Sequence, residues 1–215
     1  MKDISVSKIF GKAWELFKAN GSDLVVVTFI YVFLSSTLSI VDSLTEGSPL
    51  IIVLIISIIC GIAQMILALG FNSILLNTVD GNKFHLQELF NKRSPTLIFQ
   101  YIVGSILSGV AIVLGFIFLI IPGIYLAIRL QYFTLCILEQ EVPDCGKALN
   151  ESWNMTEGHV LDLFSLGILS ICLVILGLIA LFVGLFVAIP VAGLMSAVAY
   201  RIMKVNLQEK LPLQL

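Results

Sequence analysis

The sequence has little charge and few of the residues that carry enzyme chemistry. Only 12% of its 215 residues are Asp, Glu, Lys or Arg, and it has two histidines and four cysteines. His85 and His159 lie far apart, and the cysteines show no metal-like or paired spacing, so we predict no metal site. The sequence also has no Walker loop, no His-Glu-x-x-His and no Gly-x-Ser-x-Gly. We therefore expect neither an enzyme nor a bound cofactor.

An excess of positive charge is also absent. The formal net charge is −2, so there is no basic face to release counterions from a phosphate backbone, and we do not expect nucleic acid as a partner. A cleavable signal peptide is not predicted either. The first twenty residues are charged and have a helical period, whereas a signal peptide has a basic cap, an apolar core and a cleavage site.

Apolar residues are abundant instead. They make up 59% of the chain, and the mean hydropathy is +1.06. Charged residues make up only 12% of the chain, whereas they make up about 25% of soluble domains. Runs long enough to cross a hydrocarbon core of about 30 Å predict spans at residues 24–41, 50–77, 95–121, 124–138, 160–181 and 184–204. Pro122-Gly123 is predicted to form the tight outer turn between the third and fourth spans. The expected fold is a single all-α polytopic membrane domain over residues 1–215.

The basic residues fall on one side of this six-span topology. The twelve are Lys2, Lys8, Lys12, Lys18, Lys83, Lys92, Arg93, Arg129, Lys147, Arg201, Lys204 and Lys210. Lys and Arg accumulate in the cytoplasmic segments of membrane proteins. The pattern therefore predicts that both termini are cytoplasmic.

Three similar stretches precede the first, third and fifth spans. Residues 15–24, 88–97 and 151–160 align without gaps, and each has an acid followed two residues later by an aromatic ring. These rings, with one further tryptophan, are predicted interfacial anchors: Trp14, Phe17, Phe90 and Trp153. Residues 4–19 are predicted to form an amphipathic helix in the interface plane. The pattern suggests three repeats of interfacial helix plus transmembrane hairpin, over residues 1–77, 78–139 and 140–205. The alternative is that any interfacial helix entering a membrane has this appearance.

The second half of the chain carries a recognisable order of short motifs. They are Ile121-Pro-Gly-Ile-Tyr125, Arg129, Ala148-Leu-Asn-Glu-Ser-Trp153-Asn-Met-Thr156-Glu-Gly158, and a Gly-studded span that ends with Pro190 and Ala199-Tyr-Arg201. This order resembles a broad group of poorly characterised bacterial membrane proteins, which includes the membrane domain attached to some glycerophosphoryl diester phosphodiesterases. The resemblance covers roughly residues 121–201 and implies a six-span protein of the bacterial plasma membrane. The phosphodiesterase catalytic domain has no counterpart here, so the resemblance implies no such activity.

Ionisable residues inside the spans are the candidate ligand site, because each costs about 2.5–3.5 kcal/mol on insertion scales. Arg129 lies near the middle of the fourth span, with Tyr125 and Tyr132 close by in sequence. It would face a polar cavity or a lipid phosphate; the alternative is a structural Arg that bonds to carbonyls, an Asp or a Tyr, or that snorkels to the cytoplasmic side. Asp162 and Arg201 complete the candidate set. Asp162 lies in the first turn of its span, where the N-terminus of the helix favours an acid; the alternative is a pairing with Arg129 or Arg201.

Three functions remain open at this point. The leading hypothesis is a non-enzymatic membrane protein that organises or regulates by binding lipid, a protein partner or a second copy of itself, since basic residues beside apolar interfacial faces suit anionic lipid. The alternative is a transporter of small solutes or lipids with a polar cavity near Arg129. A membrane-embedded enzyme that acts on lipid headgroups is disfavoured by the missing catalytic constellation.

Overall fold

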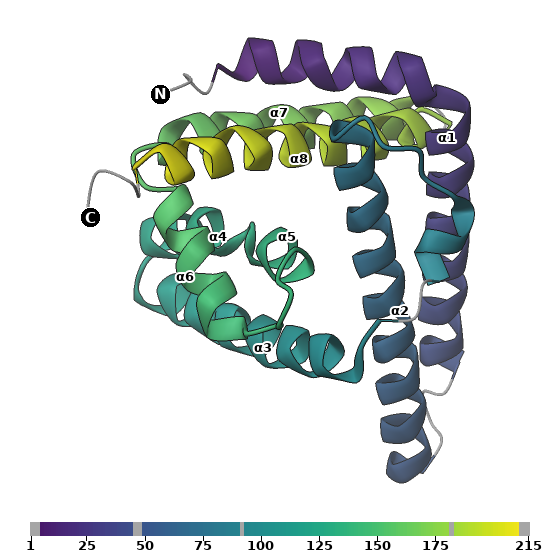
Figure 1. Cartoon of the computed structure of the whole chain (residues 1–215). Helices are drawn as coiled ribbons and strands as arrows, with labels where there is room; N and C mark the ends of the chain where they lie inside the picture. Colours follow the sequence, from purple (N-terminus) through teal and green to yellow (C-terminus); the bar gives the residue numbers. More distant parts are fainter. Residues whose placement is uncertain (1–4, 45–48, 91–92, 181–182, 211–215) are drawn as a thin grey trace.

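A computed structural model describes residues 5–44, 49–90, 93–180 and 183–210 (Figure 1). Its elements are α1 (Val6–Leu44), α2 (Leu50–Val79), the 3₁₀ helix η1 (Leu86–Phe90), α3 (Pro95–Phe118), α4 (Ile120–Leu130), α5 (Phe133–Leu138), α6 (Cys145–Met155), α7 (Val160–Ile179) and α8 (Leu185–Lys210). No strand occurs within these ranges. Several predictions concern residues outside them: Lys2, Lys92, the first residue of the predicted amphipathic helix (residue 4) and the last residue of the predicted fifth span (residue 181).

The six predicted spans are confirmed. Six helical segments are long and apolar enough to cross a membrane, and α4 and α5 together make one of them. Their large apolar side chains are widely exposed on the protein surface, as at Phe118, Ile121 and Leu161, which is the arrangement expected where lipid tails replace water. The chain is an all-α, multi-pass membrane protein.

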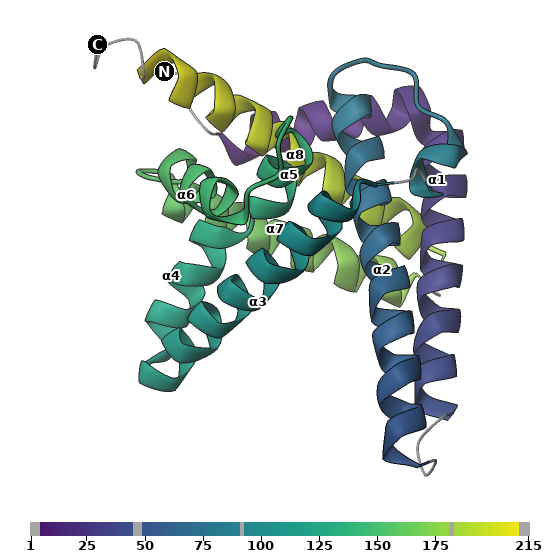
Figure 2. The same ribbon diagram turned by 60° about the horizontal axis from the view of Figure 1, so that its bottom comes forward.

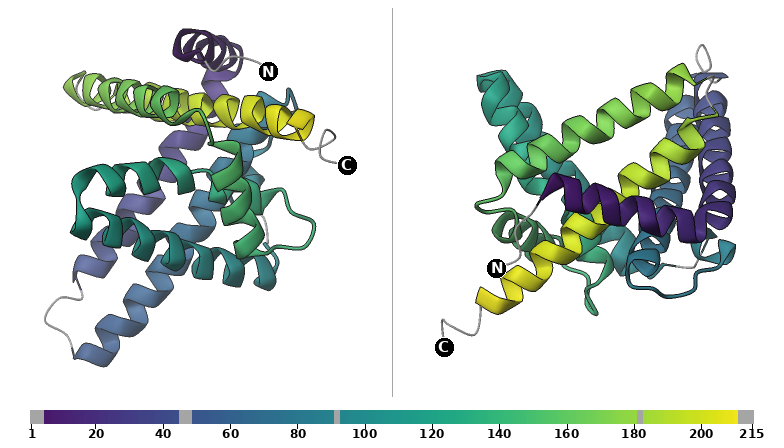
Figure 3. Two further views of the ribbon diagram at one scale, coloured as in Figure 1. Left: turned by 90° about the vertical axis from the view of Figure 1, so that its left-hand side faces the viewer. Right: turned by 90° about the horizontal axis from the view of Figure 1, so that it is seen from above.

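The first helix bends where the predicted interfacial segment meets the first span. Asn20 has non-helical backbone angles (φ −123°, ψ 19°), and its side-chain amide donates a hydrogen bond to the Leu16 carbonyl at 3.1 Å. The part before the bend crosses α8 (Figure 1 and Figure 3, right). Its stripe of Ile9, Ala13 and Phe17 is buried in the core. This apolar stripe therefore packs on protein, whereas the sequence led us to expect contact with the membrane interface.

Three hairpins make up the body of the protein: α1–α2, α3–α4 and α7–α8. They diverge from the side that carries both termini (Figures 2 and 3). α8 lies at the centre, where it contacts α1, α2, α6 and α7. The first part of α1, then η1, then α6 precede the three hairpins in turn, which is the element order of the predicted three units. Whether these units are true repeats stays a prediction.

Glycines let several of these helices approach closely, as small residues do in membrane bundles. A Cβ atom on Gly115 of α3 would lie 2.9 Å from the Cα atom of Gly123 in α4. On α2, a Cβ atom at Gly70 would collide with the backbone of Leu89, so only glycine lets η1 pack there. Substitution at these positions requires the backbones to separate.

The predicted turn at Pro122-Gly123 is wrong. α3 ends at Phe118, Leu119 is extended (φ −167°, ψ 155°), and α4 begins at Ile120. Pro122 therefore lies in the first turn of α4, where proline loses nothing because the first amide hydrogens of a helix have no acceptor within it. The fourth span is also interrupted at residues 131–132, between α4 and α5.

Candidate functional site

The most buried charged side chain of the described residues is Arg129, in the last turn of α4. It is 3% exposed. Its guanidinium carbon lies 4.2 Å from the ring centre of Trp153 and 5.6 Å from that of Tyr125. The two rings meet edge to face, with an interplanar angle of 83°. Arg129 therefore lies in an aromatic enclosure formed by α4 and α6.

Arg129 has no counter-ion among the described residues. None of their ion pairs includes it, and its buried Nε has no hydrogen-bond partner. Asp162 faces His159, at 3.8 Å, so the pairing with Arg129 that the sequence offered as an alternative is not formed. Asp162, an acid at the start of the fifth span, is therefore not the counter-ion of Arg129.

α6 holds the backbone of Arg129 in place. The Ser152 hydroxyl donates to the Arg129 carbonyl at 2.8 Å, and the Thr156 hydroxyl approaches the same carbonyl at 3.5 Å. The last carbonyls of a helix lack partners within it, so these hydroxyls satisfy the end of α4. Because Trp153 follows Ser152 directly, the same contact fixes the ring that covers the guanidinium.

A groove of about 320 Å³ lies beside Arg129, between α4 and the start of α7. Its lining is almost wholly apolar and consists of Ile121, Ile124, Tyr125, Ile128, Val160, Leu161 and Phe164. Tyr125 belongs both to the groove and to the enclosure of Arg129. Leu161, on the rim, is 80% exposed, so the groove opens sideways from the protein.

A second group of charges brings together residues that are far apart in the chain, and we name it the Glu139 cluster: Asp80, Glu139, Glu151, Tyr200, Arg201 and Lys204. Arg201 binds Asp80 and, at 2.6 Å, Glu139. Lys204 lies 2.5 Å from Glu139 and 3.8 Å from Glu151. The cluster thereby ties the ends of α2 and α5 and the middle of α6 to α8.

Glu139 is the centre of this cluster. The Tyr200 hydroxyl donates to it at 2.6 Å. Burial by itself would raise the pKa of Glu139, but hydrogen bonds from Lys204 and Tyr200 and the charges of Lys204 and Arg201 outweigh it and lower the pKa below the ordinary value. Burial raises the pKa of Glu151, an effect that Lys204 only partly offsets. The fold thus shifts the pKa values of these two glutamates in opposite directions.

The structure divides the predicted ligand set. Arg129 and Tyr125 come together under Trp153, whereas Arg201 and Tyr132 belong near Glu139, where the Tyr132 and Tyr200 rings stack at 6.3 Å. Asp162 lies apart from both groups.

Sequence reasoning missed Glu139 itself. The signal was the spacing of Tyr200, Arg201 and Lys204 on one helix face, opposite an acid that ends the fourth span.

The four predicted anchor rings have different surroundings. Trp14 and Phe90 are exposed, so both are available to a headgroup layer. Phe17 is buried and stacks on Trp14 at 5.7 Å, and Trp153 covers Arg129. Their role as interfacial anchors stays a prediction.

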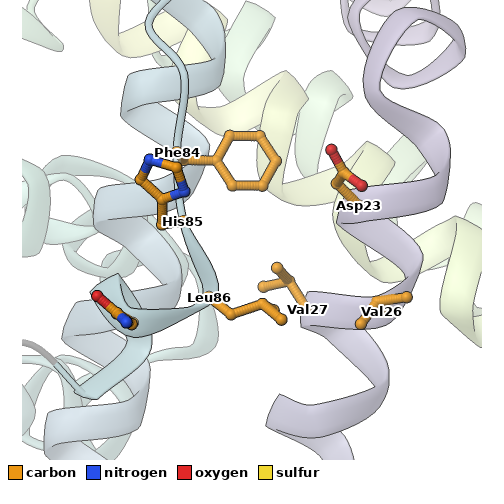
Figure 4. Close-up of a pocket in the computed structure, with 7 residues that line it drawn as sticks. Asp23, Val26, Val27, Phe84, His85 and Leu86 are labelled. Atoms are coloured by element: carbon orange, nitrogen blue, oxygen red, sulfur yellow. The ribbon is translucent and has the colours of Figure 1, made fainter.

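Another cavity, of about 600 Å³, lies between α1 and the segment that leads into η1, including the first residues of η1. Figure 4 shows Phe84, His85 and Leu86 on one side and Asp23, Val26 and Val27 on the other. Asp23 and His85 are exposed, and the part of the chain that the structure describes has no group of three His, Cys, Asp or Glu that could hold a metal ion. None of the described residues that line this cavity has a buried side-chain atom without a hydrogen-bond partner.

Comparison with known proteins gives no match to a family model, a curated protein or a solved structure.

Proposed function

We propose that this protein is a non-enzymatic protein of the bacterial cytoplasmic membrane that binds an anionic lipid headgroup at Arg129 and so organises or regulates its surroundings. The observation that carries the proposal is a buried guanidinium without a counter-ion. The cytoplasmic position of both termini rests on the one-sided Lys and Arg distribution. The bacterial location, and kinship with the phosphodiesterase-associated membrane domains, rest on the motif resemblance.

The energetics of Arg129 favour a bound anion. Removing a charge from water costs several kcal/mol even after the protein relaxes. Stacking on Trp153 and Tyr125 returns about 2 kcal/mol in a desolvated site, and the carboxyl end of α4 adds about 0.3–1 kcal/mol. These contributions fall short of the cost. A phosphate or carboxylate, which the planar guanidinium binds through two parallel hydrogen bonds, would offset the remainder.

Access to Arg129 depends on Tyr125. The Tyr125 ring is 40% exposed. The position of Trp153, in contrast, is fixed by the neighbouring Ser152, whose hydroxyl donates a hydrogen bond to the Arg129 carbonyl of α4. A turn of the Tyr125 side chain outward, away from Trp153 and from the groove, uncovers the guanidinium without moving a helix. Trp153 is then the fixed side of the headgroup site, and Tyr125 is the side chain that moves to open it.

Transport is the second candidate function, and a different cavity supports it. The groove beside Arg129 has an apolar lining apart from Tyr125, which suits a lipid better than a polar solute. A polar cavity of about 340 Å³ lies instead between α1, α2 and α3, with Tyr31, Ser35, Gln64, Tyr101 and Ser105 in its lining. A solute path, if the protein has one, would run there.

The test measures lipid retention. Protein purified in mild detergent is incubated with phosphatidylglycerol and analysed by native mass spectrometry. Arg129→Gln should lower retention about tenfold, the loss of about 1.4 kcal/mol. Lys147→Gln is the matched control, because it removes one positive charge from an exposed position of α6 and should leave retention unchanged. Equal retention by wild type and Arg129→Gln would refute the proposal.

A further inference from the structure

The enclosure of Arg129 and the α4–α7 groove adjoin at Tyr125. Resting on the function proposed above, we infer that the groove holds an acyl chain of the same lipid. The ligand is then a chain-bearing phospholipid with an anionic phosphate, drawn sideways from the bilayer. Free phosphate or a detached headgroup has no acyl chain and would leave the groove empty.

The direction of the groove supports this arrangement. Its α4 lining has the spacing of one helix face, at Ile121, Ile124, Tyr125 and Ile128. Ile128 directly precedes Arg129, and Ile121 lies about 12 Å further along the axis at about 1.5 Å per residue. The groove therefore runs along this face towards the α3–α4 turn, and it adjoins the guanidinium at the Tyr125 ring. A phosphate at Arg129 would place the first part of its chain along this face.

The chemistry of the lining specifies which part of the ligand goes where. The lining of the groove is almost wholly apolar, and Tyr125, whose ring centre lies 5.6 Å from the Arg129 guanidinium carbon, is the one lining residue with a polar side-chain group. A headgroup elsewhere in the groove would lose its hydrogen bonds to water without replacement. Charge complementarity thus fixes the phosphate at Arg129, and the open rim at Leu161 admits the chain laterally.

A groove-filling substitution tests the chain site separately from the headgroup site. Leu161→Trp adds bulk at an exposed rim position, so the fold should tolerate it. Leu176→Trp is the matched control, since Leu176 is an exposed residue of the same helix outside the groove. Retention of dioleoylphosphatidylglycerol should fall about tenfold in Leu161→Trp and stay unchanged in Leu176→Trp. Dihexanoylphosphatidylglycerol and inorganic phosphate should compete with it only weakly.

The outcomes separate the two proposals. If Arg129→Gln loses the dioleoyl lipid and Leu161→Trp retains it, the headgroup site stands and the chain site is overturned. Displacement by inorganic phosphate at the same concentration as by the lipid overturns the chain site as well. Retention of the lipid by Arg129→Gln overturns the proposed function, on which the chain site rests.

A second measurement does not depend on a groove variant. The chain has two tryptophans, so Trp14→Phe leaves Trp153 as the sole emitter. Phosphatidylglycerol brominated near the carboxyl end of its chains should quench Trp153 at least about twofold more than equally brominated phosphatidylcholine, because the quaternary ammonium of phosphatidylcholine offsets the negative charge that its phosphate would bring to Arg129. Equal quenching by both lipids would overturn the inference.

Discussion

Among the described residues, Arg129 and Arg201 are the arginines that the fold places against aromatic rings, and they differ in their acidic partners and in their exposure. Arg201 lies 5.6 Å from the Tyr200 ring and binds Asp80 and Glu139. Arg129 has aromatic rings but no acid within the described residues. The side chain of Arg201 retains 27% exposure, whereas Arg129 is 3% exposed. Stability alone would place the acid at the more buried cation, so the missing acid points to a ligand.

The largest effect on stability should come from breaking the paired arginine. Arg201→Met leaves Asp80 without the cation it binds and Glu139 with Lys204 alone, and should lower the free energy of unfolding by about 2–4 kcal/mol, near the range for truncating a desolvated ion pair. Unfolding in mixed detergent micelles, followed by circular dichroism, gives this value. Folded Arg201→Met should still retain phosphatidylglycerol, since Arg129 is unchanged. A loss of lipid without a loss of stability would reverse the roles assigned to the two arginines.

Acid should weaken the same cluster to a lesser degree. The pKa of Glu139 is lowered in the folded protein, so its ionised form contributes stability above the ordinary glutamate pKa of about 4.5. That contribution is lost as the pH falls through the folded pKa. Unfolding measured from pH 7 to pH 3 should show stability decreasing below about pH 4.5, with a shallower decrease in Glu139→Gln. An identical slope in the variant would remove Glu139 from the acid response.

The contrast between the two arginines also shows what the sequence can and cannot predict. The six spans are predictable because bilayer thickness sets the length of an apolar run, and Arg129 is conspicuous because charge within such a run is expensive. The Glu139 cluster is not, since Asp80, Glu139 and Arg201 meet only through the packing of α8. Trp153 has the right ring for an interfacial anchor, but only the fold shows that it faces a cation.

Local chemistry misled in one place for a related reason. Pro122 disfavours a helix in its interior, yet the first turn of a helix accepts it, and the sequence does not reveal whether the helix begins after the proline or two residues before it. The environment of the part of α1 before Asn20 was also not predictable from the sequence. The apolar face before it could have met lipid or protein, and α8 supplies a protein surface.

Substitution of the unpaired arginine should change stability little. Arg129→Gln loses about 2 kcal/mol of stacking but also relieves the burial of an uncompensated charge, so the lipid-free protein should stay within about 1 kcal/mol of wild type. Added phosphatidylglycerol should raise the unfolding temperature of wild type only, because a ligand stabilises the state that binds it. An equal rise in both proteins would place the stabilising lipid elsewhere.

The smallest effect is expected at Glu151, and its sign distinguishes it from Glu139. Burial raises the pKa of Glu151, so its charged form costs the folded state stability above the ordinary glutamate pKa, and Lys204, at 3.8 Å, only partly compensates. Glu151→Gln removes both that cost and the repulsion from Glu139. At pH 7 its free energy of unfolding should be unchanged or higher by about 0.5 kcal/mol, whereas Glu139→Gln lowers it. If Glu151→Gln destabilises as much as Glu139→Gln, then Lys204 is shared equally between the two acids and the cluster has two centres.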